Sequence, residues 1–324
     1  MITVEHLTKC YGDFLAVDDL SFEIDEGHVY GFLGPNGAGK STTMNIMAGC
    51  LSATGGRVLI DGHDIFEEPA QAKKLIGYLP EQPPLYMNES PEEYLRFVGE
   101  AKGLKGAELT EQVASVISQT GIGHVKHRRI SALSKGYKQR VGIAQALLGN
   151  PKVIILDEPT VGLDPIQIIE IRDLIKELGR THTVIFSSHI LSEVQTICDR
   201  ILIISRGKLA AFGEPKELEQ QMMSANEISV TAELAPETMQ EWLSRAAYVQ
   251  EVRVTVGENG MTSALIRSDH ENIYDVSRAV FKVFAEQGTP LLEMSLKKAN
   301  LEDIFLELTE NQPEEPEESE EDDA

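Results

Sequence analysis

The sequence predicts an α/β domain over residues 1–218 and a small α+β domain over residues 222–309. In the first part, short apolar runs alternate with amphipathic helical stretches, and such runs are typical of strands buried on both faces of a parallel sheet. The expected strands are at 29–33, 152–156, 183–187 and 200–204. Strands of this kind require helices packed around them, which is the α/β pattern.

The second part has a different order of elements. After residue 222 the pattern predicts strand, helix, strand, strand, helix, strand and a final helix, and the first six elements follow the βαββαβ order of a ferredoxin-like domain. The expected ranges are 227–234, 236–246, 249–256, 262–267, 271–286, 291–296 and 301–308, with a turn at 258–260. The last segment, 310–324, holds nine Asp or Glu and no Lys or Arg. It has too little apolar surface to fold, so we expect it to be disordered.

The composition excludes several functions. The 324 residues include 52 acidic and 29 basic side chains, for a formal net charge of -23. So acidic a chain is not expected to bind nucleic acid, because binding requires Lys and Arg to neutralise phosphates. Cys10, Cys50 and Cys198 are widely separated, which argues against a disulfide framework or a zinc site. No secretory signal and no apolar run of about 18 residues is found, so a membrane role would need a partner.

The strongest motif follows the first predicted strand. Residues 34–42 fit G-x-x-x-x-G-K-[ST], the phosphate loop, and read Gly34-Pro35-Asn36-Gly37-Ala38-Gly39-Lys40-Ser41-Thr42. Glycines let backbone N–H groups turn toward a β-phosphate, Lys40 reaches the β and γ oxygens, and the Ser41 hydroxyl can ligate Mg²⁺. The positive end of the following helix adds to the same site.

Two carboxylates follow the strand at 152–156. Asp157 stands at the end of the strand, where it can position Mg²⁺, as in the Walker-B arrangement. Glu158 is one residue further and points elsewhere, so it is suited to polarise the attacking water. A strand with a phosphate loop followed by a strand with Asp-Glu predicts nucleotide hydrolysis.

Between these motifs lies Leu133-Ser134-Lys135-Gly136-Tyr137, which resembles the L-S-G-G-Q signature of ATP-binding-cassette (ABC) proteins. Lys135 and Tyr137 depart from the usual form, while Ser134 and Gly136 keep the groups that family members present to the γ-phosphate of ATP on the opposite subunit. Ser134 can also cap a helix that begins at Lys135.

Further residues match the family in order. Tyr11 resembles the aromatic residue that stacks on adenine, and Asp164 resembles the D-loop aspartate, although it is also a standard N-cap before a proline. Glu81 aligns with the Q-loop glutamine that senses Mg²⁺ and the membrane partner, but Gln82 is its neighbour, so either residue can have this role. His189 resembles the histidine held against the γ-phosphate.

The resemblance implies an ABC ATP-binding subunit with a helical subdomain at about 83–140, from the bacterial subgroup of drug, sodium and gliding-motility exporters. It implies ATP and Mg²⁺ as cofactors, with Ser41, Asp157 and Glu81 around the metal and Lys40, Glu158 and His189 as catalytic residues. Two copies would sandwich two ATP molecules, as a homodimer or pseudo-dimer, against a separately encoded integral-membrane permease at the inner face of the cell membrane. The alternative is a soluble ABC-type ATPase acting as a regulatory or ribosome-associated factor.

Overall fold

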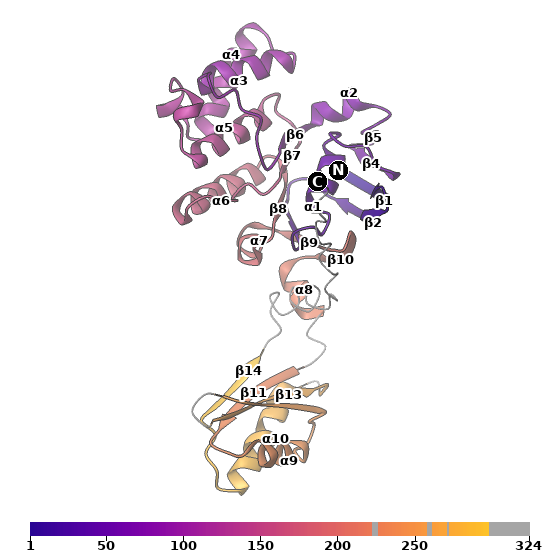
Figure 1. The fold of residues 1–324 in the computed structure, drawn as a ribbon, viewed down its shortest axis with the longest axis vertical. Helices are drawn as coiled ribbons and strands as arrows, with labels where there is room; N and C mark the ends of the chain where they lie inside the picture. The colour runs from indigo at the N-terminus through magenta and orange to yellow at the C-terminus, as the bar shows by residue number, and fades with distance from the viewer. Residues whose placement is uncertain (222–225, 258–260, 271, 298–324) are drawn as a thin grey trace, which may run out of the picture. The chain divides into compact units, whose positions relative to one another are not determined.

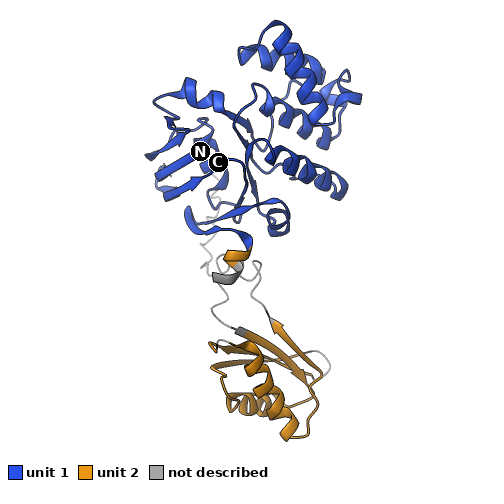
Figure 2. Ribbon diagram, turned by 180° about the vertical axis from the view of Figure 1, so that it is seen from behind, with its two compact units in different colours: residues 1–215, 307–324 blue, residues 216–306 orange. Residues whose placement is uncertain are grey.

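The computed structural model describes residues 1–221, 226–257, 261–270 and 272–297. The chain divides into two compact units, the first holding Met1–Pro215 and the second beginning at Lys216 (Figure 2). The boundaries expected from the sequence, 218 and 222, stay a prediction. The expected turn at 258–260, the final helix near 301–308 and the acidic segment 310–324 lie outside the described residues.

The first unit contains a six-stranded sheet (Figure 1). Its order is β10-β9-β3-β8-β7-β6, and the four strands expected from the apolar runs are β3, β7, β8 and β9. The bounds are β3 Val29–Leu33, β6 Ile76–Leu79, β7 Val153–Leu156, β8 Thr183–Ser188, β9 Arg200–Ser205 and β10 Lys208–Gly213. All pairs except β9–β10 are parallel. The carboxyl ends of β3, β7 and β8 therefore meet at one edge of the sheet, and the α/β class is confirmed.

A second, antiparallel sheet was not expected from the sequence. Its order is β2-β1-β4-β5, with bounds β1 Ile2–Tyr11, β2 Phe14–Ile24, β4 Gly55–Ile60 and β5 His63–Asp64. Helix α1, Lys40–Met47, buries Met44, Ile46 and Met47 in a core cluster that draws on both sheets. The two sheets thus fix the helix that follows the phosphate loop.

Three helices lie together at one end of the first unit (Figure 1). They are α3 Pro91–Ala101, α4 Gly106–Gln119 and α5 Lys135–Leu147. Ser90 caps α3 through a capping box with Glu93, and Ser134 caps α5, as expected. The remaining helices of this unit are α2 Pro69–Ala72, α6 Pro165–Gly179, α7 Leu191–Ile197 and the 3₁₀ turns η1 Lys73–Leu75, η2 Gly123–Val125 and η3 Ile130–Ala132. Helix α8, Pro215–Gln221, starts at the last residue of this stretch and otherwise belongs to the second unit.

The second unit has the ferredoxin-like order. Its sheet runs β12-β13-β11-β14 with every pair antiparallel. The bounds are β11 Asn226–Ala232, α9 Pro236–Ser244, β12 Glu251–Val256, β13 Thr262–Ser268, α10 Ile273–Glu286 and β14 Glu293–Lys297. Alternate residues of β11 and β13 pack with Met239, Leu243 and Phe284 of the helices to form a separate core. Among the described helices, none is long and apolar enough to cross a membrane.

Candidate active site

The phosphate-loop motif connects β3 to α1. Gly39 caps α1 with φ +100°, a left-handed conformation that favours glycine. A Cβ at Gly39 would also lie 2.6 Å from the carbonyl oxygen of Ala16. Both the torsion and the close approach therefore require glycine, and the loop places Lys40 in the first turn of α1.

Lys40 is buried, with 5% of its side chain exposed. Its Nζ donates to the carbonyl oxygens of Gly34, at 2.8 Å, and Pro35, at 3.1 Å, and lies 3.6 Å from Oε1 of Glu158. Burial lowers the pKa of Lys40, while the nearby carboxylates of Glu158, Asp157 and Glu81 act in the opposite direction. The ammonium group of Lys40 and the neighbouring carboxylates thus lie together where little water reaches them, and electrostatic interactions between them are strong there.

Asp157 comes directly after β7 and is 2% exposed. Its Oδ1 accepts hydrogen bonds from Ser41 Oγ at 3.0 Å and from Ser187 Oγ at 2.7 Å. Ser187 Oγ also accepts a hydrogen bond from the backbone N–H of Glu158 at 2.7 Å. Ser187 was not expected from the sequence, and it fixes both carboxylate residues from the neighbouring strand β8.

The spacing of Ser41 and Asp157 suits a Mg²⁺ ion. Neighbouring ligands of an octahedral Mg²⁺, each bonded at about 2.1 Å, lie about 3.0 Å apart. The hydroxyl and carboxylate oxygens have that separation, and both are hard oxygen donors of the kind Mg²⁺ prefers. Glu81, also expected near the metal, is exposed and lines the cavity described below.

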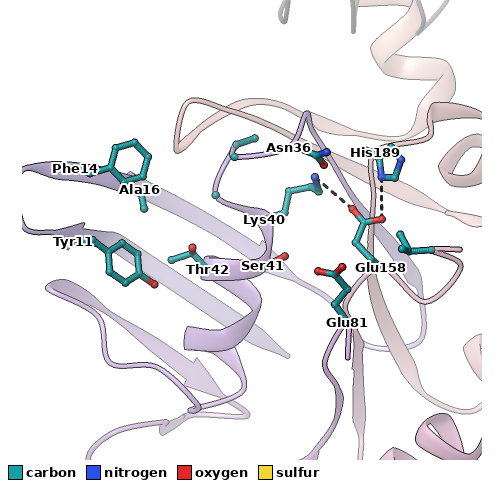
Figure 3. A pocket seen from close by; sticks show the side chains of 14 residues that line it. Tyr11, Phe14, Ala16, Asn36, Lys40, Ser41, Thr42, Glu81, Glu158 and His189 are labelled. Atoms are coloured by element: carbon teal, nitrogen blue, oxygen red, sulfur yellow. Dashed lines mark hydrogen bonds and ion pairs between the residues drawn. The ribbon is translucent and has the colours of Figure 1, made fainter. Parts of the chain in front are cut away.

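Glu158 lies between Lys40 and His189. Its Oε2 is 3.1 Å from His189 Nδ1, and Figure 3 shows both contacts meeting at this carboxylate. The Glu158 side chain is 8% exposed, whereas that of His189 is 42% exposed. Glu158 has φ +44°, which is uncommon for a residue other than glycine. The backbone turn directs Glu158 away from Asp157.

A cavity of about 440 Å³ joins these groups. Tyr11 on β1 and Phe14 on β2 lie on the opposite side of it from Glu158 and His189 (Figure 3). Its lining consists of Tyr11, Phe14, Ala16, Asn36, Gly37, Ala38, Gly39, Lys40, Ser41, Thr42, Glu81, Glu158, Val161 and His189. Gln82 is not part of this lining. Phe14 was missed, although a second aromatic residue three positions after Tyr11 in the sequence was a signal for it.

The signature residues line a different cavity, of about 220 Å³. Ser134 accepts a hydrogen bond from the backbone N–H of Tyr137, and Asp164 caps α6 by accepting from the N–H groups of Ile166 and Gln167. A Cβ at Gly136 would lie 2.6 Å from Gln167 Oε1, so a larger residue there would displace the Gln167 side chain of α6. The lining of this second cavity consists of Ser134, Gly136, Tyr137, Arg140, Asp164, Ile166, Gln167, Glu170 and Ile171. Within one chain, the signature is separate from the Lys40 cavity.

Comparisons with known proteins agree with this geometry. The family model described as "ABC transporter" matches residues 17–161. The chain is 33% identical over 308 residues to the "Uncharacterized ABC transporter ATP-binding protein YxlF" of Bacillus subtilis (strain 168), covering 95% of this chain and 99% of the relative. It is 34% identical over 310 residues to the "Linearmycin resistance ATP-binding protein LnrL" of the same organism, covering 95% and 98%.

A solved structure gives the same result. The "Dimeric structure of a post-hydrolysis state of the ATP-binding cassette MJ0796 bound to ADP and Pi" matches with a TM-score of 0.60 and 26% identity. The match covers 66% of this chain and 98% of that one. The region of likeness contains a complete cassette of the other protein.

Proposed function

The chain belongs to the ABC transporter family of ATP-binding proteins, and from this premise we propose that it drives export of a drug or antibiotic through a separately encoded permease. It is an ATP-binding and ATP-hydrolysing subunit of a transporter. The observation that carries the export proposal is the match to LnrL, a linearmycin resistance protein, over almost the full length of both chains. The alternative of a ribosome-associated or regulatory factor has no support in these relatives.

We assign the hydrolytic roles from the contacts around Glu158. Its carboxylate accepts the proton of the attacking water as general base, since it is buried between a cation and an imidazole. Lys40 stabilises negative charge on the transferred phosphoryl group, and His189 contacts the γ-phosphate from the exposed side. Tyr11 and Phe14 line the other end of the cavity, where they form a stacking surface for the adenine base.

Ser41 and Asp157 are the residues that would hold Mg²⁺. Their oxygens are at the separation that neighbouring Mg²⁺ ligands need. When bound, the ion neutralises charge on the β- and γ-phosphates. Ser187 keeps the Asp157 carboxylate oriented toward Ser41 by donating to the same oxygen. Glu81, at the cavity wall, is better placed than Gln82 for the role of the Q-loop residue.

A second copy completes the site in this proposal. Ser134 and Gly136 line their own cavity, away from Lys40 of the same chain, so they are available to ATP bound by another chain. The N-terminus of α5, capped by Ser134, presents backbone N–H groups and a positive dipole end to that phosphate. Binding of ATP then favours the closed dimer, and hydrolysis releases it.

We place the permease contact on an aromatic cluster in the helical group, at the inner face of the membrane. Tyr86 packs against Tyr94 and Phe97, with ring centroids 5.5 and 5.2 Å apart. Tyr86 and Phe97 remain 51% and 49% exposed, which is a large apolar exposure on one surface. Tyr86 of this cluster follows Glu81 by only five residues, so an occupant of this surface can influence the ATP cavity through a short segment.

A complementation experiment tests this proposal. A strain lacking the chain is complemented with wild type, Lys40→Ala or Phe97→Ser, and its growth is measured with antibiotics, linearmycin among them. We expect resistance with wild type but not with Lys40→Ala or Phe97→Ser, and co-purification of a polytopic membrane protein with wild type and Lys40→Ala but not with Phe97→Ser. Phe281→Ser, which changes another exposed phenylalanine, 58% exposed on α10, is the matched control and should behave as wild type. Resistance that persists with Lys40→Ala would contradict the proposal.

A further inference from the structure

A buried carboxylate lies behind the active site, in the first turn of α7. Glu193 is 1% exposed and stands four residues after His189. Its Oε2 accepts hydrogen bonds from Thr160 Oγ1 at 2.8 Å and from Ser188 Oγ at 2.9 Å. Its Oε1 lies 3.2 Å from Nη2 of Arg172 on α6. The charge is therefore paired with one guanidinium, and Oε2 receives two hydroxyl hydrogen bonds, while Oε1 has the ion pair but no hydrogen bond among the described residues.

The hydroxyl partners of Glu193 belong to the segments that carry the hydrolytic side chains. Thr160 is two residues after Glu158, in the turn that begins with the left-handed backbone of Glu158. Ser188 immediately precedes His189, and its Oγ also accepts a hydrogen bond from the N–H of Ile190 at 3.0 Å. One carboxylate oxygen thus holds the residues on both sides of the contact between Glu158 and His189.

The third partner of Glu193 is Arg172, which links it to helix α6. Arg172 belongs to α6, whose N-cap is Asp164 of the D-loop. Glu193 itself is not part of the lining of the ATP cavity. Any effect that it has on hydrolysis must therefore act through Thr160, Ser188 and Arg172.

We propose that Glu193 is a positioning residue for ATP hydrolysis, which holds the turn after Glu158 and the strand end before His189 in fixed register. This inference rests on the proposed roles of Glu158 and His189. Their contact, 3.1 Å long, joins two separate segments, and both segments are bonded to the same carboxylate oxygen. Displacement of a catalytic group by about 1 Å can reduce the rate about 100-fold without removing substrate binding.

The test removes the two hydroxyl groups and leaves Glu193 in place. Thr160→Val, Ser188→Ala and the double variant are compared by steady-state ATP hydrolysis of the full chain. We expect kcat to fall about tenfold or more in the double variant, with KM for ATP and nucleotide affinity within about twofold of wild type. A lower kcat with an unchanged KM indicates loss of transition-state positioning rather than loss of the fold.

Thr120→Val is the matched control. Thr120 is also a buried threonine, and its Oγ1 donates to the carbonyl oxygen of Val116 at 2.7 Å within the helical group. Its kcat should stay at the wild-type value, while its thermal unfolding midpoint should fall as much as that of Thr160→Val. A double variant with wild-type kcat, or with an equal loss in Thr120→Val, would overturn the inference.

Two further variants separate this inference from the function on which it rests. Glu158→Gln serves as the reference: if it hydrolyses ATP normally, the role of Glu158 itself is wrong. If Glu158→Gln is inactive and the double hydroxyl variant is not, only the role of Glu193 fails. Glu193→Ala removes the carboxylate itself, and we expect it to lower kcat. Combining Glu193→Gln with Arg172→Met keeps an oxygen acceptor and removes the guanidinium that would otherwise lose its partner, so we expect this double variant to recover much of the kcat lost in Glu193→Ala.

Discussion

Glu158 combines an unusual backbone conformation with a central place in the cavity. At φ +44° it lies in a region that costs a non-glycine residue about 1 kcal/mol or more. The hydrogen bond from its N–H to Ser187 Oγ helps to hold this conformation, and the result is a carboxylate that meets both Lys40 and His189. Strained residues of this kind are concentrated at functional sites. The local geometry therefore supports the role of Glu158 as general base.

We predict that Glu158→Gln leaves ATP binding unchanged and lowers the rate of hydrolysis about 100-fold or more, the range expected for loss of a general base. The amide keeps the size of the side chain but does not accept the proton of the attacking water. Phosphate release and fluorescent-nucleotide binding measure the two effects. Glu177→Gln, which changes an exposed carboxylate paired with Arg180 on α6, is the control. Hydrolysis by Glu158→Gln at a rate close to wild type would rule out the assignment.

Sequence spacing predicts some of these residues but not others. Lys40, Asp157 and Glu158 belong to motifs of fixed spacing next to apolar strands, so they were identified without a structure. Ser187 was not identified from the sequence, because a serine near a strand end is compatible with many environments. Its role depends on the sheet order, in which β8 lies between β3 and β7 and brings Ser187 beside Asp157. That order is a tertiary property that local patterns do not encode.

Elements buried on both faces were easier to predict than half-exposed ones. Strands β3, β7 and β8 are continuous apolar runs, and their expected and observed bounds differ by one residue at most. Strand β1 has polar residues among its apolar ones, and its pairing with β2 shifts register between Val4 and Leu7. Such an irregularity interrupts the period of two on which recognition of half-buried strands depends. The antiparallel sheet was therefore missed.

The end of helix α5 depends on a distant lysine. Lys102 Nζ donates to the carbonyl oxygens of Gln145, Ala146 and Leu148 at 3.1, 3.4 and 2.7 Å. Terminal carbonyl groups of a helix lack partners within the helix, and a cation there also interacts favourably with the helix dipole. Lys102 follows directly after α3, so this contact joins two helices of the helical group.

We predict that Lys102→Met lowers the free energy of unfolding of the first unit by about 1 to 2 kcal/mol, because a charged donor to several carbonyl oxygens is lost. Methionine retains the apolar length of the side chain, so the loss reports on the ammonium group. Urea denaturation measures the change, and Lys74→Met, at an exposed lysine, serves as the matched control. Equal stability of the two variants would show that the cap contributes nothing.

At the scale of the whole molecule, the residues that we propose to bind nucleotide line two separate cavities. The phosphate loop, Glu158 and His189 line one cavity, while Ser134, Gly136 and Asp164 line the other. A relative of known structure, the MJ0796 cassette, is a dimer in a post-hydrolysis state. Because the two sets of residues lie in different cavities, we propose that two chains share each ATP. The proposal can be tested by placing one inactivating substitution in one chain and a different one in its partner.

We predict that two inactive variants restore activity when they are mixed. Lys40→Ala damages the phosphate loop, and Ser134→Arg places a long cation at the exposed N-terminus of α5, where it blocks the ATP of the other chain. Each variant alone should be inactive as a homodimer. In a mixed dimer, Lys40 of one chain meets Ser134 of the other, so an equal mixture should recover roughly a quarter of wild-type hydrolysis, since half the dimers are mixed and each has one intact site.

Two controls make the mixing experiment decisive. Ser134→Arg should still bind ATP with wild-type affinity, because its own Lys40 cavity is unchanged, and this shows that the variant is folded. A mixture of Lys40→Ala with Glu158→Gln should stay inactive, since both changes lie in the same cavity and no mixed dimer contains an intact site. If Ser134→Arg is active by itself and the first mixture gives only the average of the two separate activities, each chain hydrolyses ATP without its partner and the shared-site model is wrong.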